Sequence, residues 1–512
     1  MNRDSSIVLI VSIFIVAVCS LVYELIAGAV SSYLLGSSIT QFSLVIGLFL
    51  AAMGLGSYLS KFVEEHLVAR FVQVEIATGL IGGFSAPALF CAFTFTESFY
   101  AVLVIVTGAV GTLIGLEIPL IIRIFRQREN SLRLTVANVM TADYIGALVA
   151  SLSFPFIFVP NLGLMRTSFL VGLLNLAVGW LCLSWFREEM GPFLGRVRLM
   201  ATLSTLVLIA GFFASTNLVE LIEDRLYPDE IIYAKQTKYQ RIVVTRWRED
   251  IRLFLDGKLQ FSTADEYRYH ECLVHPAVAA ARPKSRALVL GGGDGMAVRE
   301  LLKYSKIKKI HLVDIDPEMT RIFRDIPLLA KLNDNVFSNG KVKVFNEDAM
   351  SFLEQSEEMY DLIIMDLPDP NNLSLGKLYT LSFYQLATRR LSRDGVIVVQ
   401  SSSPFFAPKA YWCVVKTLSA VAVPELGKTL EVAPYHVNVP SFGEWGYVLA
   451  SRHKIDPKKL ELKVPLRFLT PETLPCLFVF PGDLQPLEVK INRLNSQELV
   501  RYYDDGYDNF FE

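Results

Sequence analysis

Glycines and aspartates near the middle of the chain are the residues whose types and spacing could do chemistry. The run Gly291-Gly-Gly-Asp294-Gly295 directly follows an apolar segment, 287–290, that is typical of a buried strand. A glycine-rich turn between a strand and a helix lets a ligand approach the backbone closely. Asp294 would repel the pyrophosphate of a dinucleotide. The turn therefore favours a positively charged ligand, such as an adenosyl sulfonium that carries an amine, over NAD.

Acidic residues also follow three later predicted strands, at 310–313, 342–345 and 360–365. Asp314 follows the glycines by about 20 residues, where a carboxylate can accept both hydroxyls of a ribose. Asp348 is suited to an adenine amino group, and Asp366 and Asp369 come after the last of these strands. Ligands of doubly wound sheets bind at the carboxyl ends of the strands, so these acids should line one crevice. Any one of them could be only a helix cap, but we do not expect all four to be.

The elements that must position these residues alternate between strands and helices. This alternation predicts an α/β domain, Rossmann-like and of the class I AdoMet type, over residues 263–512. Before it, β-branched segments alternate with turn signals, and we expect a small β-hairpin domain at 221–262. Its strands are predicted at 239–244, 251–255 and 258–261.

A polar and aromatic helix should connect the small sheet to the α/β domain. Thr263-Ala-Asp-Glu266 fits a capping box that opens this helix. Its first turns carry Tyr269 and His270. Alone, these side chains could form a solvated face or part of a site.

Residues 1–220 are much less charged than the rest of the chain. They hold 23 charged residues, whereas the remaining 292 positions hold 77. Crossing the hydrocarbon core takes about 20 apolar residues as a helix, which predicts a multi-pass α-helical membrane domain at 1–220. About seven segments qualify: 7–30, 41–60, 72–95, 100–122, 142–162, 166–186 and 198–217.

Four acids lie in or beside these apolar segments: Glu24, Glu75, Glu117 and Asp143. Intramembrane acids are costly and are functional candidates by default. One interpretation is hydrogen bonding between helices. The other is a path for a polycation such as a polyamine.

At this point the sequence resembles the spermidine/spermine synthase family of polyamine aminopropyltransferases, in its membrane-fused form. About 200 residues carry the resemblance in one order. The motifs are Tyr239-Gln240, Leu255–Gln260, Asp265-Glu266, Tyr269-His270-Glu271, His275-Pro276, Gly291–Gly295, Asp314-Ile-Asp316, Asp348, Asp366-Leu-Pro-Asp369-Pro370, Leu378-Tyr379-Thr380, Phe383-Tyr384, Gly395-Val396 and Gln400.

The resemblance implies a role for each candidate residue. Asp366 would be the proton acceptor. The amine groups would be held by His270, Asp294, Asp369 and Tyr269. The adenosine part of decarboxylated S-adenosylmethionine (AdoMet), or of the product methylthioadenosine, would be held by Gln240, Asp314, Asp348 and Ala349, and we assign Gln260, Gly291 and Gly293 to the same nucleoside site.

The sequence departs from the family pattern at two places near the amine. Asp369-Pro370 is followed by Asn371-Asn372-Leu373 where the family usually has a Gly-Pro pair. The usual Pro-Thr-Tyr-Pro segment is Pro440-Ser-Phe442-Gly443 here, so a tyrosine hydroxyl is missing. A third change, Asp314 where Glu is common, is smaller. The choice of amine acceptor is therefore open, whereas the adenosyl site is expected to be intact.

The expected reaction transfers an aminopropyl group from decarboxylated AdoMet to a diamine such as putrescine, which gives spermidine and methylthioadenosine. The sulfonium is already a good leaving group, so we expect no metal and no cofactor beyond this co-substrate. An AdoMet-dependent methyltransferase would share the strand order and the ribose acid. A polyamine-binding transporter or sensor is the other alternative.

Partners and location follow from the same features. The two parts of the chain are each near neutral, which gives no argument for nucleic-acid binding. The six scattered cysteines suggest neither a zinc site nor disulfides. We expect contact with a lipid bilayer. The sequence leaves open whether the chain forms a homo-oligomer.

We expect a multi-pass protein of the cell membrane, but the loop charges conflict with a cytoplasmic catalytic domain. Nine basic residues lie in the loops after spans two, four and six, and one, Arg166, lies in the others. Basic loops stay cytoplasmic. The amino terminus would then be cytoplasmic, and seven crossings would place the catalytic domain outside. The substrate is a cytosolic metabolite, so a cytoplasmic catalytic domain is expected nevertheless.

Overall fold

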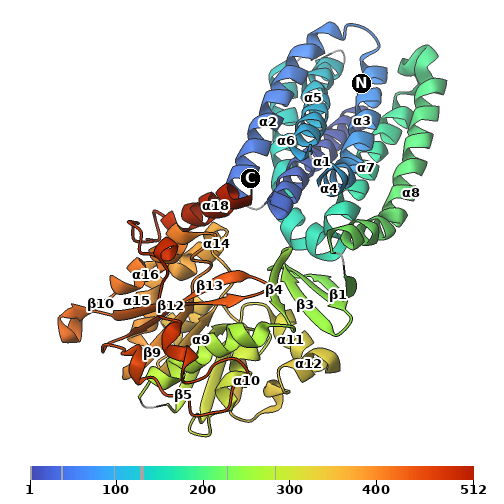
Figure 1. The fold of residues 1–512 in the computed structure, drawn as a ribbon. Helices are drawn as coiled ribbons and strands as arrows, with labels where there is room; N and C mark the ends of the chain where they lie inside the picture. The colour runs from blue at the N-terminus through green and yellow to red at the C-terminus, as the bar shows by residue number, and fades with distance from the viewer. Residues whose placement is uncertain are drawn as a thin grey trace. The chain divides into compact units, whose positions relative to one another are not determined.

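Two compact units make up the structure, Met1–Glu230 and Ile231–Glu512 (Figure 1). The structure, a computed structural model, describes residues 3–35, 38–96, 98–126, 132–227, 229–282 and 284–511. The boundary predicted at 220 lies instead at 230/231. The reason is that helix α8 (Leu194–Leu226) continues through the predicted position.

The described part of the first unit is helical. Its other α-helices are α1 (Arg3–Leu35), α2 (Ser38–Leu59), α3 (Leu67–Gly83), α4 (Ser85–Phe95), α5 (Phe99–Arg126), α6 (Leu132–Ser153) and α7 (Val159–Trp185). Short helical turns lie between them: η1 (Ser60–Phe62), η2 (Phe154–Phe158) and η3 (Arg187–Phe193).

Six helical runs among the described residues are long and apolar enough to cross a membrane, against about seven predicted. The difference lies in Arg133–Trp185, a 53-residue run that contains the segments predicted at 142–162 and 166–186. Its backbone breaks at Gly163, where φ is +72° and ψ is 174°, a conformation that glycine adopts without steric cost. Helix α6, which precedes this break, and helix α7, which contains it, both pack against α1.

The second unit begins with a small antiparallel sheet of order β1-β2-β3-β4. The strands are β1 (Glu230–Gln236), β2 (Arg241–Trp247), β3 (Asp250–Leu255) and β4 (Lys258–Ser262). The apolar face of this sheet, which includes Val244 and Phe261, packs in one cluster with Met319 and Phe323 of α11 (Pro317–Asp325). The small sheet therefore belongs to the second unit and does not form the separate domain predicted at 221–262.

A seven-stranded sheet of order β12-β13-β9-β8-β5-β6-β7 forms the centre of this unit. The neighbouring strands β9, β8, β5, β6 and β7 are parallel to one another. At the β9 edge, β13 and then β12 are added in antiparallel orientation. The strands are β5 (Arg286–Gly291), β6 (Lys309–Val313), β7 (Val342–Phe345), β8 (Tyr360–Asp366), β9 (Leu391–Gln400), β12 (Glu431–Val439) and β13 (Gly443–Ser451); a separate pair is β10 (Ala422–Val423) and β11 (Lys428–Thr429). This is a Rossmann-like fold.

Helices cover both faces of the sheet (Figure 1). Alternate residues of β5 point to opposite faces: Leu288 and Leu290 belong to one buried cluster, and Ala287 and Val289 belong to the other. The first face is covered by α13 (Ala349–Gln355), α15 (Leu381–Arg389), α16 (Pro408–Ser419) and α18 (Glu498–Phe511), and the second by α9 (Glu266–Ala280) and α10 (Met296–Leu302). The remaining helices are α12 (Pro327–Leu332), α14 (Leu373–Gly376) and α17 (Thr473–Cys476), with the turns η4 (Val336–Ser338), η5 (Lys377–Tyr379), η6 (Pro424–Leu426), η7 (Pro457–Lys459) and η8 (Gly482–Leu484).

Candidate active site

The glycine turn brings the end of β5 against the end of β8. Gly291 pairs in register with Asp366. A Cβ on Gly291 would lie 2.0 Å from the carbonyl oxygen of Asp366, and its φ of +78° also favours glycine. A Cβ on Gly293 would lie 2.5 Å from Oδ2 of Asp314. These two predicted nucleoside residues thus allow Asp366 and Asp314 to approach the turn closely.

Asp366 is held by a tyrosine hydroxyl. The Tyr269 hydroxyl, from α9, donates a hydrogen bond to Oδ1 of Asp366 at 2.7 Å. Burial raises the pKa of Asp366 above its ordinary value, although the charge of His270 and the Tyr269 hydrogen bond act in the opposite direction. A carboxylate with a raised pKa is a better proton acceptor than an exposed one.

His270 supplies a positive charge beside these acids. Its Nδ1 lies 2.8 Å from Oε2 of Glu266, and Arg299 donates to both oxygens of the same carboxylate at 3.0 and 2.9 Å. Burial opposes the charge on His270, but the hydrogen bond to Glu266 and the nearby Asp294 and Asp366 raise its pKa to about 9. A protonated ring only donates hydrogen bonds. This arrangement suits neutralising the acids better than accepting a bond from an ammonium group.

Asp294 completes this acidic group at the start of α10. Its Oδ1 accepts a hydrogen bond from the Met296 backbone N–H at 2.8 Å. Burial raises the pKa of Asp294 to about 6; the charge of His270 lowers it and that of Asp366 raises it. Asp294, Asp366 and His270 therefore influence one another and form one electrostatic group.

Asp369 lies in a second polar group connected to the first by Tyr379. The Ser402 hydroxyl donates to Oδ2 of Asp369 at 3.1 Å, and the Tyr503 hydroxyl of α18 also donates to this carboxylate. Burial raises the pKa of Asp369, whereas the Lys258 charge and these hydrogen bonds lower it. Tyr379 is fully buried and interacts electrostatically with both Asp369 and Asp366.

Lys258 and Tyr503 were not predicted as site residues. The Nζ of Lys258 lies 5.1 Å from the centre of the Tyr503 ring, a distance typical of a cation–π contact. Lys258 belongs to the motif Leu255–Gln260, so the sequence marked its position but did not indicate its role. No motif marked Tyr503, because α18 lies outside every segment that carried the resemblance.

The predicted ribose acid lies at the end of β6. Asp314 accepts hydrogen bonds from the backbone N–H groups of Gly293 and Asp316, at 3.0 and 2.8 Å. Burial raises the pKa of Asp314 to about 7, and these two hydrogen bonds act against the shift. Gln240 donates from Nε2 to Asp316 at 3.2 Å, which places Gln240 at the same corner.

The predicted adenine residues begin α13. Asp348 caps this helix by accepting from the backbone N–H groups of Met350 and Ser351. Its other oxygen accepts from Nζ of Lys377 at 2.8 Å. Burial opposes the charge on Asp348, but the Lys377 and backbone hydrogen bonds bring its pKa below the ordinary value. Ala349 is the first residue of α13 and is buried.

Gln260 is the predicted nucleoside residue that the structure does not connect to the others. Its Nε2 donates to the backbone oxygen of Lys258 at 3.2 Å, within the same strand. Its assignment to the nucleoside site stays a prediction.

The segment that departs from the family pattern packs beside Tyr269. Ser441 donates its backbone N–H and its hydroxyl to the carboxylate of Asp265, at 2.6 and 2.8 Å. The capping box predicted at 263–266 is therefore wrong: Asp265 is the N-cap of α9 and makes no side-chain cap. The Phe442 ring lies 5.9 Å from that of Tyr269, so an apolar ring stands beside Tyr269 where the family pattern has a tyrosine.

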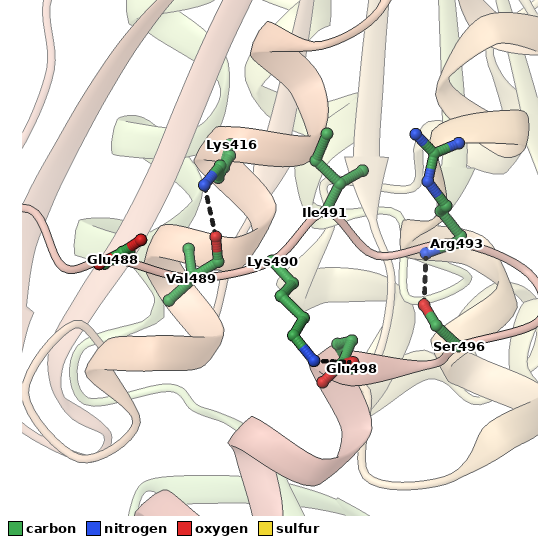
Figure 2. Close-up of a pocket in the computed structure, with 8 residues that line it drawn as sticks. All are labelled: Lys416, Glu488, Val489, Lys490, Ile491, Arg493, Ser496 and Glu498. Atoms are coloured by element: carbon green, nitrogen blue, oxygen red, sulfur yellow. Dashed lines mark hydrogen bonds and ion pairs between the residues drawn. The ribbon is translucent and has the colours of Figure 1, made fainter.

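A surface hollow elsewhere in this unit contains none of the predicted residues (Figure 2). Two of its lysines already have partners there: Lys490 donates to Glu498 at 3.1 Å, and Lys416 donates to the carbonyl oxygen of Val489. In the described part of the chain, no group of three or more His, Cys, Asp or Glu side chains could hold a metal ion.

Comparisons with known proteins show the family to which the chain belongs. The model of the spermine/spermidine synthase domain matches residues 266–461. A polyamine aminopropyltransferase from Leptospira interrogans is 45% identical over 504 residues, which cover 98% of this chain and 99% of the relative. Polyamine aminopropyltransferase 2 from Ralstonia nicotianae is 46% identical over 513 residues, or 99% of each chain.

A solved spermidine synthase in complex with the transition state analogue AdoDATO is 25% identical. The alignment covers 49% of this chain and 86% of that one, with a TM-score of 0.45.

The chain belongs to the spermine/spermidine synthase family, whose members here are polyamine aminopropyltransferases. The similarity covers both units, so these relatives have counterparts of the helical unit as well.

Proposed function

We propose that the second unit transfers an aminopropyl group from decarboxylated AdoMet to a diamine such as putrescine. The products would be spermidine and methylthioadenosine. The observation that carries this proposal is the Tyr269–Asp366 hydrogen bond beside Asp294. It places a buried carboxylate of raised pKa among groups that attract a cation.

The first requirement of the reaction is a free amine. An aliphatic amine has a pKa of about 10.4, so a neutral nitrogen at pH 7 costs about 4.6 kcal/mol. A base beside the nitrogen must share this cost. Asp366 accepts the proton in our proposal, and the Tyr269 hydroxyl fixes the orientation of its carboxylate.

The second step is a displacement at carbon. The neutral nitrogen forms a bond to the propyl carbon, the bond from that carbon to sulfur breaks, and its electron pair leaves with methylthioadenosine. Holding the two reactants in line supplies much of the acceleration. Asp314 and Gln240 would orient the ribose, and Asp348 and Ala349 the adenine.

The remaining acids would select the amine. Asp369 is suited to the distal ammonium end of the diamine, and Asp294 to the end that reacts. The bond to Glu266 keeps His270 protonated, and this positive charge offsets part of the negative charge of Asp369 and Asp294. The apolar Phe442 beside Tyr269 would influence which acceptors fit.

A product assay tests this function. Purified chain is incubated with decarboxylated or ordinary AdoMet and a panel of amines, and the products are identified by mass spectrometry. We expect methylthioadenosine and an aminopropylated amine from the decarboxylated donor alone. Methylated products from ordinary AdoMet would establish the methyltransferase alternative. Amine binding with neither product would establish a sensor.

We further propose that the first unit lies in the cell membrane and the catalytic unit on its cytoplasmic side. Support comes from six runs of sufficient length and apolarity in the described residues. Six crossings would place both chain ends on one side, whereas a second crossing within Arg133–Trp185 would make seven. Arg128, one of the basic residues in the loop after the fourth predicted span, lies outside the described residues.

Cys476 gives a direct test of this orientation. Its side chain is exposed, whereas four of the other five cysteines are buried and Cys91 is half-buried. A membrane-impermeant maleimide should label Cys476 in inverted vesicles but not in sealed right-side-out vesicles, with Cys476→Ser as the control. Labelling in right-side-out vesicles would place the catalytic unit outside.

A further inference from the structure

Two glutamates are completely buried inside the helical unit. Glu75 of α3 and Glu117 of α5 are 0% and 1% exposed. Asn175 of α7 donates from Nδ2 to Oε2 of Glu75 at 3.0 Å, and Thr78 of α3 donates to Oε1 of Glu117 at 3.1 Å. Both carboxylates thus have hydrogen-bonding partners that carry no charge.

Four oxygen atoms around these glutamates have no hydrogen-bond partner. They are Oε1 of Glu75, Oε2 of Glu117, Oδ1 of Asn175 and the hydroxyl oxygen of Tyr23, and all four are buried. The Asn175 oxygen is placed at the site by the bond from its own amide nitrogen to Glu75. Native proteins leave few buried polar atoms without a partner, so four in one place need an explanation.

Tyr23 of α1 lies about two helical turns from Glu75, within electrostatic reach of both glutamates. Its ring lies against Gly82, because a Cβ there would be 2.5 Å from the ring. Gly82 is seven residues after Glu75 in α3, two helical turns along the same face. The Tyr23 hydroxyl interacts electrostatically with Glu75 and Glu117, and the two glutamates interact with each other. Oxygen atoms from α3, α5 and α7 therefore converge, and the Tyr23 hydroxyl of α1 lies near this cluster.

The charge of this cluster requires a partner from outside the chain. Two ionised carboxylates cannot share an apolar interior without a counter-charge. The Tyr23 hydroxyl can donate only one hydrogen to the three acceptor oxygens. Cys19 of α1 and Asp143 of α6 are the other titratable groups that act on the glutamates, and neither supplies a positive charge. A bound proton or a bound cation would satisfy the cluster.

We infer that Glu75, Glu117 and Asn175 form a site for one monovalent cation, which exchanges with a proton held by the two carboxyl groups. The ligand is an alkali ion or the primary ammonium end of an amine, because oxygen atoms bind either. With no cation bound, the carboxyl pair keeps one proton; when a cation binds, that proton is released and the net charge of the site is unchanged. The helical unit would then bind an ion as well as hold the chain in the membrane.

Proton release tests this site. The purified full-length protein, in weakly buffered detergent solution with a pH-indicator dye, is titrated with NaCl, KCl or putrescine dihydrochloride, and choline chloride controls for ionic strength. We expect about one proton released per chain, as when a metal displaces protons from its ligands. Release by the alkali salts identifies an alkali ion, and release by putrescine alone identifies an ammonium group.

Glu75→Gln and Glu117→Gln should each abolish this release, whereas Glu65→Gln, which changes an exposed acid of the same unit, should leave it unchanged. Subtracting the putrescine titration of Glu75→Gln removes any proton released by the second unit. Glutamine keeps the volume of glutamate, and its amide can donate to an unpartnered oxygen, so these variants should fold.

Tyr23→Phe provides a second variant that keeps the carboxyl pair. It should raise the midpoint cation concentration by less than about tenfold, because it removes a polar hydroxyl near the site and leaves the carboxyl pair and Asn175 in place. Normal methylthioadenosine binding in every variant would show that the second unit is intact. No release from the wild-type protein with any salt, or equal release from the wild type and Glu75→Gln, would overturn the site.

Discussion

The two units both bury carboxylates, but they balance the charge in different ways. In the catalytic unit, Asp366 and Asp294 lie beside His270, which a bond to Glu266 keeps protonated. In the helical unit, Glu75 and Glu117 bond only to an amide and a hydroxyl. Where the chain supplies a cation, the acids can stay ionised and act on a substrate. Where only neutral partners are seen, a proton or an external cation would balance the charge, as in the site that we propose for Glu75 and Glu117.

Asp369→Asn should have the largest effect on amine binding. Removing one partner of a buried charged hydrogen bond typically costs 2–5 kcal/mol, so the KM for putrescine should rise about 100-fold. Steady-state kinetics measure it, with Asp394→Asn, an exposed aspartate of the same unit, as the control. If the KM of Asp369→Asn stayed at the wild-type value, Asp369 would not hold the distal ammonium group.

Tyr269→Phe should lower kcat about tenfold at pH 7, because the Tyr269 hydrogen bond both orients the Asp366 carboxylate and lowers its pKa. The acidic limb of the pH profile should therefore move to higher pH in this variant. A uniform loss of activity at all pH values would show that Tyr269 contributes only packing.

The pH dependence of amine binding should report Asp294. Its pKa of about 6 means that the carboxylate is ionised above pH 6 and takes up a proton as the pH falls through that value. The proton removes the charge that attracts the amine, so the KM should rise about tenfold per pH unit below 6. Asp294→Asn should flatten this rise in KM. If the KM of this variant depended on pH as that of the wild type does, Asp294 would not be the group whose protonation weakens amine binding.

Lys258→Met should have the smallest effect, in the opposite direction. The Lys258 charge acts on Asp369 and competes with the ammonium group of the substrate. Because Lys258 is exposed, the gain is screened, and we expect the KM for putrescine to fall about threefold. The difference from the wild type should shrink at high salt. A KM that rises instead would mean that Lys258 helps to bind the substrate.

Much of the catalytic site could be predicted because strand order determines it. Asp314 and Asp366 follow parallel strands, and parallel strands that alternate with helices place their carboxyl ends at one edge. Tyr503 could not be predicted, because its contact with Asp369 depends on where α18 packs after more than 130 intervening residues. The charge on His270 depends on Glu266 and Arg299, which only the packing of α9 on α10 brings together.

The helical unit gave weaker predictions for a related reason. Glu75 and Glu117 could be identified as unusual from their apolar surroundings alone. Which helices lie beside them could not, because apolar helices carry no pattern that specifies their neighbours. The contacts with Asn175 and Tyr23 are products of that packing. The number of crossings was similarly uncertain, since a single glycine, Gly163, interrupts Arg133–Trp185.

In the reaction that we propose, Asp366 removes the proton from the attacking amine. The most direct measurement compares kcat and the methylthioadenosine Kd of Asp366→Asn with those of the wild type. General-base catalysis contributes about 10²- to 10⁴-fold, so kcat should fall by about 10³ while the Kd stays within about twofold. A variant that turns over at nearly the wild-type rate would contradict the account.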